Sequence, residues 1–526
     1  MNGSKDLCRS HKQFVKESKA SRKSFGPILS ALPQLAGGVV LVALMIGCGG
    51  SSSKPASTTP TPSCAGASAA AIPAAKAHSL ATPAQALSPI TPQYFGLHID
   101  VQALPGGNPP LPWPTTLTPV LPFGTIRMNS TETRWSDIDK GNGNYDFTTL
   151  DQWRTLYQQN EGANPAGDYQ IIFTLYSVPK YISSNPTDGC NFSNTSGHQA
   201  GSCDPPADVC SDGTGTDQAF TDFVTALAQH VNGDSLPKIH YWEIWNEPND
   251  ITFWNGSLPQ LARMAQDARC VIVGTDCNSL TSYTARAIDP TSQMLTPPPV
   301  QSSDETNTSL NSPAGWMSAY LAAGGGQYAD IIGFHGYVES NNPAGVEGVF
   351  TVAQSIAPAA TAAGVSSKPI WDTELGYSTT VVPDQNMQAG WLASAYLLQA
   401  GLGIQRVNWF EYGATNFGTL YVYGPPAGPN AAEVAYGVVY NWLVGATPSG
   451  PCASSGTVWT CDFTLSTGAQ AQAVWDSSQT CTPCTYFPFN PSPVYIKFQD
   501  LQGNSQSISS GSSVQIGAQP ILLESQ

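Results

Sequence analysis

Two short stretches of the sequence each place a glutamate where proton transfer or nucleophilic attack could occur. Glu247 follows an apolar run in YWEIWNEPN (241–249), and Glu374 follows another in PIWDTELGY (369–377). Pro248 lacks a backbone N–H group, so strand pairing would stop just after Glu247. Two facing carboxyl groups, one protonated and one ionised, are what the hydrolysis of a glycosidic bond requires. The stretches therefore predict this chemistry, provided that the fold brings them together.

The elements that must position these glutamates are visible as alternating patterns. Seven short apolar runs are typical of strands: YFGLHI, FGTIRM, QIIFTLY, IHYWEIW, DIIGFHGYV, PIWDTELGY and IQRVNWFEY. An eighth is expected around 292–295, and helix-like stretches such as DQAFTDFVTALAQHV lie between the runs. This order predicts an α/β fold, a (β/α)8 TIM barrel, in which reactive side chains lie at the C-terminal ends of the strands. Glu247 would follow the fourth strand, and Glu374 would lie at the end of the seventh.

Composition divides the chain into four parts. We expect a signal peptide of the lipoprotein type at 1–47, a linker rich in Ser, Thr, Pro and Ala at 48–89, and the catalytic barrel at 90–445. Residues 446–526 are rich in Ser, Thr, Gly and Pro, with alternating apolar runs. This last part is expected to be a small antiparallel β-domain, similar to a β-sandwich.

The leader predicts export from a bacterial cell. Seven basic residues precede an apolar run, LAGGVVLVALMIG, which is too short to span a bilayer comfortably. The run ends in Met-Ile-Gly-Cys48, which resembles a lipobox, so Cys48 is expected to carry a lipid anchor. Ordinary signal-peptide cleavage and an uncleaved anchor remain the alternatives. The mature protein is expected to be a cell-envelope lipoprotein or a secreted protein.

Charge restricts the class of partner. The whole chain has a formal net charge of −16, and removal of the leader, with seven basic and two acidic side chains, leaves about −21. Such an acidic chain repels nucleic acid and anionic lipid, so we expect no nucleic-acid partner and membrane contact only through the anchor. A neutral poly- or oligosaccharide is the expected substrate. The sequence gives no indication of the oligomeric state.

Cysteine spacing favours disulfides over metal binding. Three pairs are close in sequence: Cys270 with Cys277, Cys452 with Cys461, and Cys481 with Cys484. Cys190, Cys203 and Cys210 form a trio that leaves one thiol unassigned, with Cys64 as a possible partner. A zinc site would need a second pair or histidines at ligand spacing, and none lies near Cys481 and Cys484.

The motifs resemble those of glycoside hydrolase clan A, whose members are retaining enzymes built on barrels. The resemblance is carried by IRMNSTETRWSDID, GNYDFTTLDQW, IIFTLYSVPKYIS, WEIWNEPN, IIGFHGYV and WDTELGYS. It is greatest to family 39, from about Phe95 through the C-terminal β-domain, while family 5 remains an alternative. The departure is Leu375-Gly376, where the xylosidases of family 39 usually have Phe-Asn. Xylosidase specificity is therefore not expected.

The resemblance implies roles for individual residues in a glycosidase that acts on β-linked glycans. Glu247 would be the acid/base and Glu374 the nucleophile of a double displacement, with the two carboxyl groups near 5 Å apart. Substrate and nucleophile would be held by Arg127, Asn246, His335, Tyr337 and Trp409. No metal or cofactor is implied. Trp135 and Tyr176 offer further flat faces for a sugar.

Each of these residues also has a structural interpretation. A single strand-end glutamate is most often solvated or salt-bridged, and tryptophans near barrel strands usually pack in the core. We expect His98 to be a hydrogen-bonded core residue. Four further carboxylates, Glu243, Glu411, Asp250 and Asp372, are expected to stand outside the catalytic pair. The alternative function is a non-catalytic surface protein that binds carbohydrate on a TIM-barrel scaffold.

Overall fold

The computed structural model describes residues 87–526 except 130, 191–197, 279–282, 284, 303–304, 306, 339–342, 414–415, 425, 482 and 510. The predicted signal peptide, Cys48, Cys64 and nearly all of the predicted linker lie outside the described residues. No helix in the described part combines the length and the apolar character that a membrane span needs.

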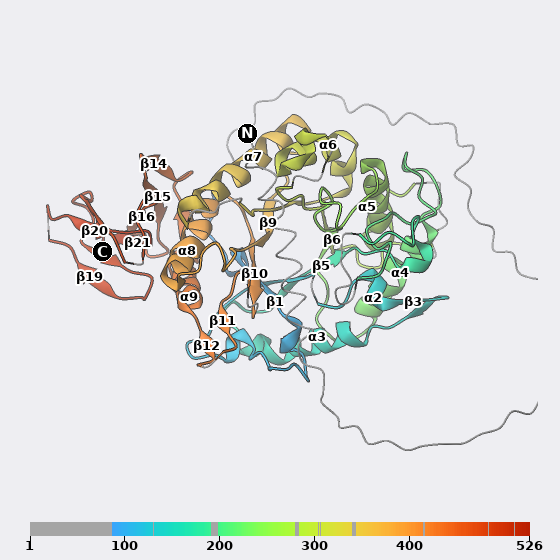
Figure 1. Cartoon of the computed structure of the whole chain (residues 1–526), viewed down its shortest axis with the longest axis horizontal. Coiled ribbons are helices and arrows are strands. Elements are labelled where there is room, and N and C mark those ends of the chain that lie inside the picture. The colour runs from blue at the N-terminus through green and yellow to red at the C-terminus, as the bar shows by residue number, and fades with distance from the viewer. Residues whose placement is uncertain are drawn as a thin grey trace, which may run out of the picture.

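A ring of eight parallel strands forms the centre of the molecule (Figure 1). The order around the ring is β7-β6-β5-β2-β1-β10-β9-β8, and a parallel bridge between Leu295 and Ile331 joins its two ends. The predicted (β/α)8 barrel is therefore confirmed. The strands are β1 (Phe95–Ile99), β2 (Thr125–Met128), β5 (Gln170–Leu175), β6 (Tyr241–Ile244), β7 (Gln293–Leu295), β8 (Ile332–His335), β9 (Ile370–Leu375) and β10 (Val407–Tyr412).

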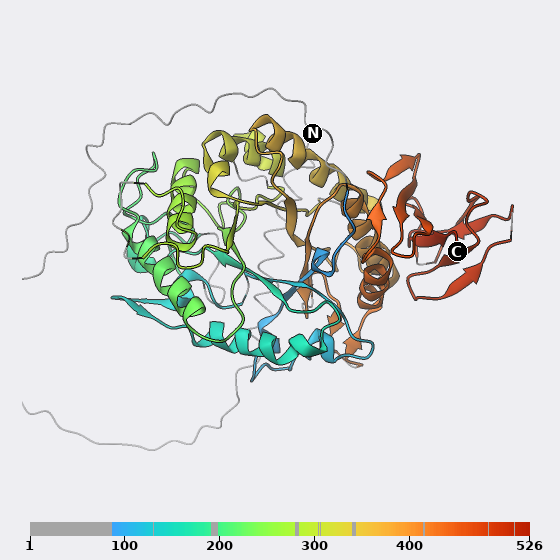
Figure 2. The ribbon, with the colours of Figure 1, turned by 180° about the vertical axis from the view of Figure 1, so that it is seen from behind.

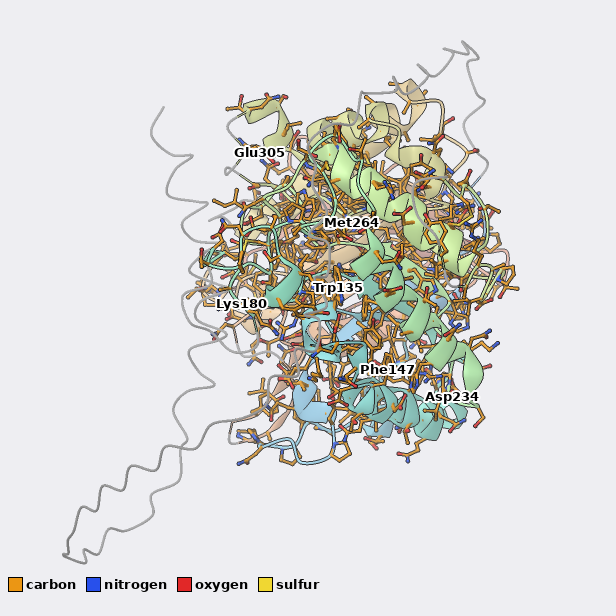
Figure 3. All side chains as sticks on the ribbon, turned by 90° about the vertical axis from the view of Figure 1, so that its right-hand side faces the viewer. Trp135, Phe147, Lys180, Asp234, Met264 and Glu305 are labelled. Carbon is orange, nitrogen blue, oxygen red and sulfur yellow. A yellow bond between two sulfur atoms is a disulfide. The ribbon has the colours of Figure 1, made fainter. Side chains whose placement is uncertain are left out.

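Helices cover the outside of the ring, as Figures 1 and 2 show from opposite sides. They are α3 (Thr148–Asn160), α4 (Gln218–Gly233), α5 (Leu258–Ile272), α6 (Pro313–Ala322), α7 (Gly348–Ala362), α8 (Gln385–Gly401) and α9 (Ala431–Leu443), with a short α2 (Trp135–Ile138). Figure 3 shows one side of this layer, with Phe147 just before α3, Asp234 just after α4, and Met264 on α5.

One expected repeat departs from the βα pattern. Between β1 and β2, the described residues 100–124 contain only two 3-10 turns, at Val101–Ala103 and Pro114–Thr116, and no α-helix. The segment is rich in proline, which removes backbone donors and clashes with the preceding turn of a helix. A proline-rich loop therefore replaces the helix at this position.

Side-chain caps define where four of the helices begin. Ser257, Ser312, Asp384 and Asn430 each accept a hydrogen bond from a backbone N–H group in the first turn of α5, α6, α8 and α9, respectively. These bonds satisfy donors that have no partner within the helix. The loops that leave β6, β7, β9 and β10 are thus tied down where they meet the helices.

The C-terminal part is an antiparallel β-domain, as the sequence predicts. Its main sheet has the order β13-β15-β16-β21-β18-β19, with β14 paired to β15, and β17 and β20 form a separate ribbon. The strands are β13 (Thr447–Pro448), β14 (Ala453–Ser455), β15 (Val458–Thr464), β16 (Gln470–Asp476), β17 (Phe487–Phe489), β18 (Lys497–Gln499), β19 (Ser505–Ser507), β20 (Val514–Ile516) and β21 (Ile521–Glu524).

The β-domain packs against the helical side of the barrel next to α8 and α9 (Figure 1). The Trp475 indole N–H group donates to the Glu347 carboxylate at 3.1 Å, and the Phe350 and Trp459 rings meet edge to face at 5.6 Å. One continuous apolar core includes buried residues from both parts.

Cysteine pairing follows the sequence prediction with one exception. Disulfides join Cys190 to Cys203, Cys270 to Cys277, and Cys452 to Cys461, and Cys210 is also disulfide-bonded. Cys481 and Cys484, expected to pair, are both free thiols. They lie opposite each other across a tight turn, where the Cys484 thiol points to the Cys481 carbonyl oxygen at 3.0 Å. This local hydrogen bond directs the Cys484 sulfur toward the backbone.

Candidate active site

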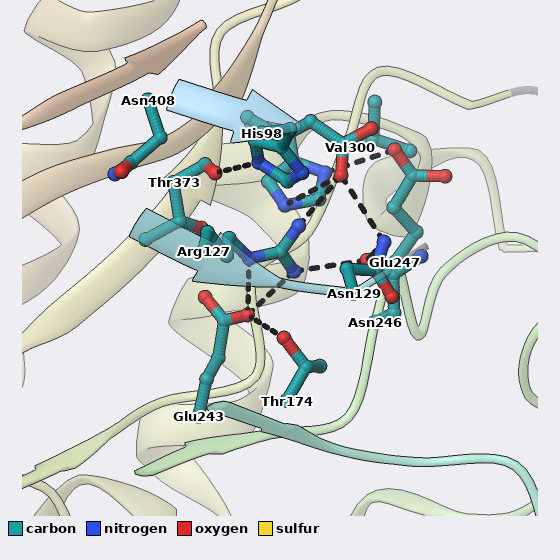
Figure 4. Close-up of polar contacts among 12 residues, drawn as sticks. His98, Arg127, Asn129, Thr174, Glu243, Asn246, Glu247, Val300, Thr373 and Asn408 are labelled. Carbon is teal, nitrogen blue, oxygen red and sulfur yellow. Dashed lines mark hydrogen bonds and ion pairs between the residues drawn. The ribbon is translucent and has the colours of Figure 1, made fainter. Parts of the chain in front are cut away.

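Polar side chains from four strands meet at the C-terminal ends of the barrel strands (Figure 4). Arg127 comes from β2, Glu243 from β6, His335 from β8 and Glu374 from β9, and Asn246 and Glu247 lie in the turn just after β6. All six side chains are buried, and Arg127, Glu243 and His335 are essentially inaccessible to solvent. The carboxyl ends of parallel barrel strands are where reactive groups gather in this fold.

Arg127 is the centre of the cluster. Its Nη1 donates to Glu374 Oε2 at 2.6 Å, its Nε donates to Glu243 Oε2 at 2.6 Å, and its Nη2 donates to Asn246 Oδ1 at 3.0 Å. Burial lowers the pKa of the guanidinium, but the negative charges of Glu243 and Glu374 outweigh this effect and raise it above its ordinary value. Arg127 is therefore a fixed positive charge between two carboxylates.

Glu374 is held through both of its oxygens. Oε2 accepts the hydrogen bond from Arg127 and a longer one from Asn129 Nδ2 at 3.4 Å, and Oε1 accepts one from the Tyr337 hydroxyl at 2.9 Å. Burial, followed by the charges of the nearby glutamates, raises the pKa of Tyr337 well above its usual value. Tyr337 therefore remains a hydrogen-bond donor to Glu374. Donors on both oxygens fix the orientation of the Glu374 carboxyl group.

Glu247 has a backbone conformation that few residues other than glycine adopt. The φ angles of Trp245 and Glu247 are 63° and 42°, in the left-handed region that is uncommon for residues other than glycine. The Trp245 indole donates to the Phe253 carbonyl at 2.8 Å and packs edge to face on Trp254, which holds this turn in place. Strain of this kind persists where the surroundings impose it, often at functional sites.

His335 links the two glutamates. Its Nδ1 lies 2.9 Å from Glu247 Oε1, and its Nε2 lies 4.0 Å from Glu374 Oε2. One oxygen of Glu247, one nitrogen of His335 and one oxygen of Glu374 all lie within 4.8 Å of one another. The two carboxyl groups are thus near the spacing of about 5–5.5 Å that is typical of retaining glycosidases.

The structure does not bring Trp409 to this cluster. Its ring is fully buried on β10, its indole N–H group donates to the Gly418 carbonyl at 2.7 Å, and it packs against Tyr377, Trp391 and Tyr396. The neighbouring aromatic rings cover the faces of the Trp409 ring against which a sugar would have to pack.

Two other aromatic residues suggested for sugar contact are also buried. Trp135 stacks on Phe223 with its ring inaccessible, and the Tyr176 hydroxyl donates to the Asn129 carbonyl at 3.1 Å. His98 is a buried core histidine, as expected, because its Nε2 donates to the Thr373 carbonyl at 3.0 Å. Burial and the nearby Arg127 charge lower the pKa of His98, so it is neutral.

Two residues of the cluster, Glu243 and Asn129, received no role from the sequence. Glu243, expected to stand outside the catalytic pair, is ion-paired with Arg127, and the Thr174 hydroxyl donates to the same Glu243 oxygen at 2.9 Å. Asn129 donates to Asn246 Oδ1 at 3.2 Å. Asn129 directly follows β2, so the strand-end reasoning that identified Asn246 could also have found it.

The other three carboxylates expected to stand outside the catalytic pair are also buried. Asp250 accepts from the Thr252 N–H group, and Asp372 accepts from the Gly336 N–H group. Glu411 lies within β10.

Glu247, His335 and Glu374 have the residue types and spacing that a metal ion could use. The Glu374 oxygen that bonds Arg127 lies 2.6 Å from a guanidinium nitrogen, so a cation there would meet a buried positive charge at close range. The cluster therefore fits an organic substrate better than a metal.

No protein-family model matches the sequence, and no curated protein does. Solved structures do match the fold. A glucosidase from Croceicoccus marinus is 14% identical, with 83% of this chain and 96% of that chain covered and a TM-score of 0.49. The catalytic domain of the GH30 xylanase C from Talaromyces cellulolyticus is 12% identical over 84% of this chain and 98% of that chain, with a TM-score of 0.49.

Family 39 is also among the matches. The GH39 enzyme from Xanthomonas axonopodis pv. citri is 15% identical, with 83% of this chain and 95% of that chain covered and a TM-score of 0.44. At these identities and TM-scores, the matches do not bear on the substrate or the chemistry of this chain.

Proposed function

We propose that this protein is a retaining O-glycoside hydrolase that cleaves β-linked glycans. The observation that carries the proposal is the pair of buried carboxyl groups, Glu247 and Glu374, with oxygens within 4.8 Å of each other at the carboxyl ends of β6 and β9. The different surroundings of the two groups support different roles. Glu374 accepts from Arg127 and Tyr337, whereas Glu247 Oε1 contacts the His335 imidazole.

In the first step, an oxygen of Glu374 attacks the anomeric carbon of the bound sugar. Glu247 gives its proton to the glycosidic oxygen, the bond to the leaving group breaks, and the sugar becomes covalently bound to Glu374. Arg127 and Tyr337 orient the Glu374 carboxylate for this attack. His335 fixes the position of the Glu247 carboxyl group.

In the second step, Glu247, now ionised, takes a proton from water. The water oxygen attacks the anomeric carbon, and Glu374 leaves as a carboxylate. The released sugar then has the same anomeric configuration as the substrate. Asn246 already accepts hydrogen bonds through its Oδ1, so its amide N–H groups are left to bind the sugar 2-hydroxyl, an interaction that strengthens in the transition state.

The disulfides and the N-terminal sequence support a proposal for where this reaction takes place. We infer that the protein acts outside the cytoplasm on an extracellular poly- or oligosaccharide, because disulfides persist in oxidising compartments. A lipid on Cys48 would hold it at the cell envelope, and the rest of the linker would let the barrel reach its substrate.

The test is sugar release by the purified mature protein and by its Glu374→Ala variant. Xylans, glucans, mannans and bacterial exopolysaccharides are incubated with each protein, and the product lengths are resolved. We expect oligomers or monomers from at least one substrate with the wild type, and none with the variant. If both folded proteins bind a glycan equally well and neither releases sugar, the result would instead support the non-catalytic carbohydrate-binding function.

A further inference from the structure

Asp372 lies two residues before Glu374 on β9, and its side chain is fully buried. On a regular strand, residues two apart point to the same face of the sheet. The two carboxyl groups nevertheless have different partners. Glu374 accepts from the Arg127 guanidinium group. Asp372 accepts instead from the backbone N–H group of Gly336, which directly follows β8. This difference points to an irregularity between β8 and β9.

The irregularity is a β-bulge in the pairing of β8 with β9. Phe334 pairs with Asp372, and the next residue of β8, His335, pairs with Glu374. Thr373 is therefore an extra residue that has no counterpart on β8. A bulge changes the direction of the side chains beside it, and bulges are common next to active sites. The direction of the Glu374 side chain thus depends on this bulge.

The Asp372 side chain holds the two strands together at the bulge. The Gly336 N–H group donates to Asp372 Oδ1 at 2.9 Å and to the Glu374 carbonyl oxygen at 3.2 Å. A Cβ atom on residue 336 would collide with Asp372 Oδ2, so the carboxyl group fills the space that a side chain at this position would need. Glycine at 336 and aspartate at 372 therefore fit each other.

Gly336 separates two residues that contact the proposed catalytic glutamates. Before it, His335 Nδ1 lies 2.9 Å from Glu247 Oε1. After it, the Tyr337 hydroxyl donates to Glu374 Oε1 at 2.9 Å. A shift of the backbone at Gly336 would move both contacts at once. The bond to the Gly336 N–H group thus restrains the surroundings of both glutamates.

Asp372 itself neither carries a charge nor reaches a substrate. Burial raises the pKa of Asp372 well above its usual value, although the hydrogen bond from the Gly336 N–H group lowers it. The carboxyl group is therefore protonated at neutral pH and adds no negative charge beside Glu374. Because the side chain has no exposed surface, it cannot touch a bound sugar.

We propose that Asp372 is a positioning residue of the glycosidase. It fixes Gly336, and thereby keeps the two chain neighbours of Gly336 in contact with the catalytic glutamates. The inference rests on the proposed function, because it concerns the same glutamate pair. It assigns to Asp372 no proton transfer and no contact with the substrate.

The test compares kcat and KM of the mature wild type with those of Asp372→Ala and Asp372→Asn, on a 4-nitrophenyl β-glycoside that the wild type hydrolyses. Asp372→Ala removes the acceptor of the Gly336 N–H group. We expect kcat to fall by about ten- to a hundredfold and KM to stay within about twofold, because misplaced reacting groups slow the reaction without weakening binding. Asp372→Asn should keep kcat within about threefold of the wild type, because its amide oxygen still accepts the bond.

A double-mutant cycle distinguishes positioning from a general loss of structure. Tyr337→Phe removes the hydroxyl that donates to Glu374. If Asp372 acts through this bond, the loss of kcat/KM in Asp372→Ala combined with Tyr337→Phe should be clearly smaller than the product of the two single losses. If Asp372→Ala does not fold, Asp372→Val replaces it in both tests, since Val suits a strand and also lacks the acceptor.

Glu433→Ala is the matched control, because it removes a buried carboxyl group from α9, outside the barrel strands. It should leave kcat unchanged, and its effect should multiply with that of Tyr337→Phe. An unchanged kcat in Asp372→Ala would overturn the inference, as would losses that multiply with Tyr337→Phe or an Asp372→Asn variant as impaired as Asp372→Ala. In each of these cases the active wild type shows that the proposed function stands. An inactive wild type would overturn the proposed function, and this inference with it.

Discussion

Arg127 joins Glu243 and Glu374 through one guanidinium group inside the barrel, with contacts of 2.5 and 2.6 Å. All three side chains are almost fully shielded from water. Glu243 therefore neutralises and orients the arginine that in turn positions the proposed nucleophile. It acts through Arg127, because its hydrogen bonds in the described structure come from Arg127 and Thr174 rather than involving Glu374.

The first prediction concerns this positioning role. Glu243→Gln keeps the shape but removes the charge, which leaves Arg127 shared between a neutral amide and Glu374. Breaking one side of a buried ion pair costs about 3–5 kcal/mol, so we expect a clear loss of stability in urea unfolding. We also expect kcat to fall while KM changes little, because Arg127 shifts relative to Glu374.

Thr174→Val provides the matched comparison for Glu243. It removes only the neutral hydrogen bond to the same Glu243 oxygen, which is worth about 1 kcal/mol. Its effect on stability and on kcat should be clearly smaller than that of Glu243→Gln. Equal effects of the two variants would contradict a special role for the buried charge.

The second prediction tests the proton donor. Glu247→Gln cannot give a proton to the leaving oxygen, and loss of a general acid typically costs about 10²–10⁴-fold in rate. The loss in kcat/KM, which reports the first step, should be large for a natural glycan and much smaller for 2,4-dinitrophenyl glycosides, whose leaving group needs no proton. Glu374→Gln should lose activity on both substrates. A Glu247 variant whose kcat/KM is equally impaired on both would argue that this glutamate has a different role.

The third prediction concerns pH and stability at Glu433, away from the site. Burial raises the pKa of Glu433 to about 8, and its Oε2 has no hydrogen-bond partner among the described residues. The folded protein thus keeps this proton up to higher pH than the unfolded chain. Stability should fall as pH rises from about 4.5 to 8, by up to about 1.4 kcal/mol per pH unit, and Glu433→Gln should flatten this slope.

The control for this pH dependence is Asp212→Asn. Hydrogen bonds from Thr214 lower the pKa of the exposed Asp212, so it is ionised in both states across this range. Melting temperatures measured between pH 5 and 8 should then show the wild-type slope for Asp212→Asn. An unchanged slope for Glu433→Gln would mean that Glu433 is already ionised in the fold.

The fourth prediction concerns metal removal. Arg127 lies against the Glu374 oxygen that a metal ion would use, so hydrolysis should not need a divalent cation. Dialysis against EDTA should leave kcat unchanged, and added Ca²⁺, Mg²⁺ or Zn²⁺ should not raise it. An EDTA-dependent loss that one of these ions restores would contradict this account of the cluster.

The sequence was sufficient to predict the barrel and the closeness of Glu247 and Glu374, because both have local signals. Buried parallel strands appear as short apolar runs, and Pro248 marks where one of them ends. The pairing of Arg127 with Glu243 could not be predicted in this way. These residues are 116 positions apart, and they meet only because β2, β5 and β6 are neighbours in register.

Aromatic residues were the least predictable part of the site. A tryptophan on a barrel strand can face the substrate or the helical layer, and its sequence neighbours do not decide between them. Trp409 is enclosed by Trp391 and Tyr396 from α8. The sequence indicates that Trp391 and Tyr396 lie on a helix, but it does not indicate that they pack against Trp409. The loop between β1 and β2 differs in this respect, because its prolines alone indicate that no helix forms.

The most direct test of the central claim is the anomeric configuration of the first sugar released. Proton NMR spectra are recorded in the first minutes of hydrolysis of a β-linked glycan, before the anomers equilibrate. The separation of the Glu247 and Glu374 oxygens, within 4.8 Å, predicts that the β-anomer appears first. If the α-anomer appears first, water attacks the sugar directly, and the assignment of Glu374 as nucleophile is wrong.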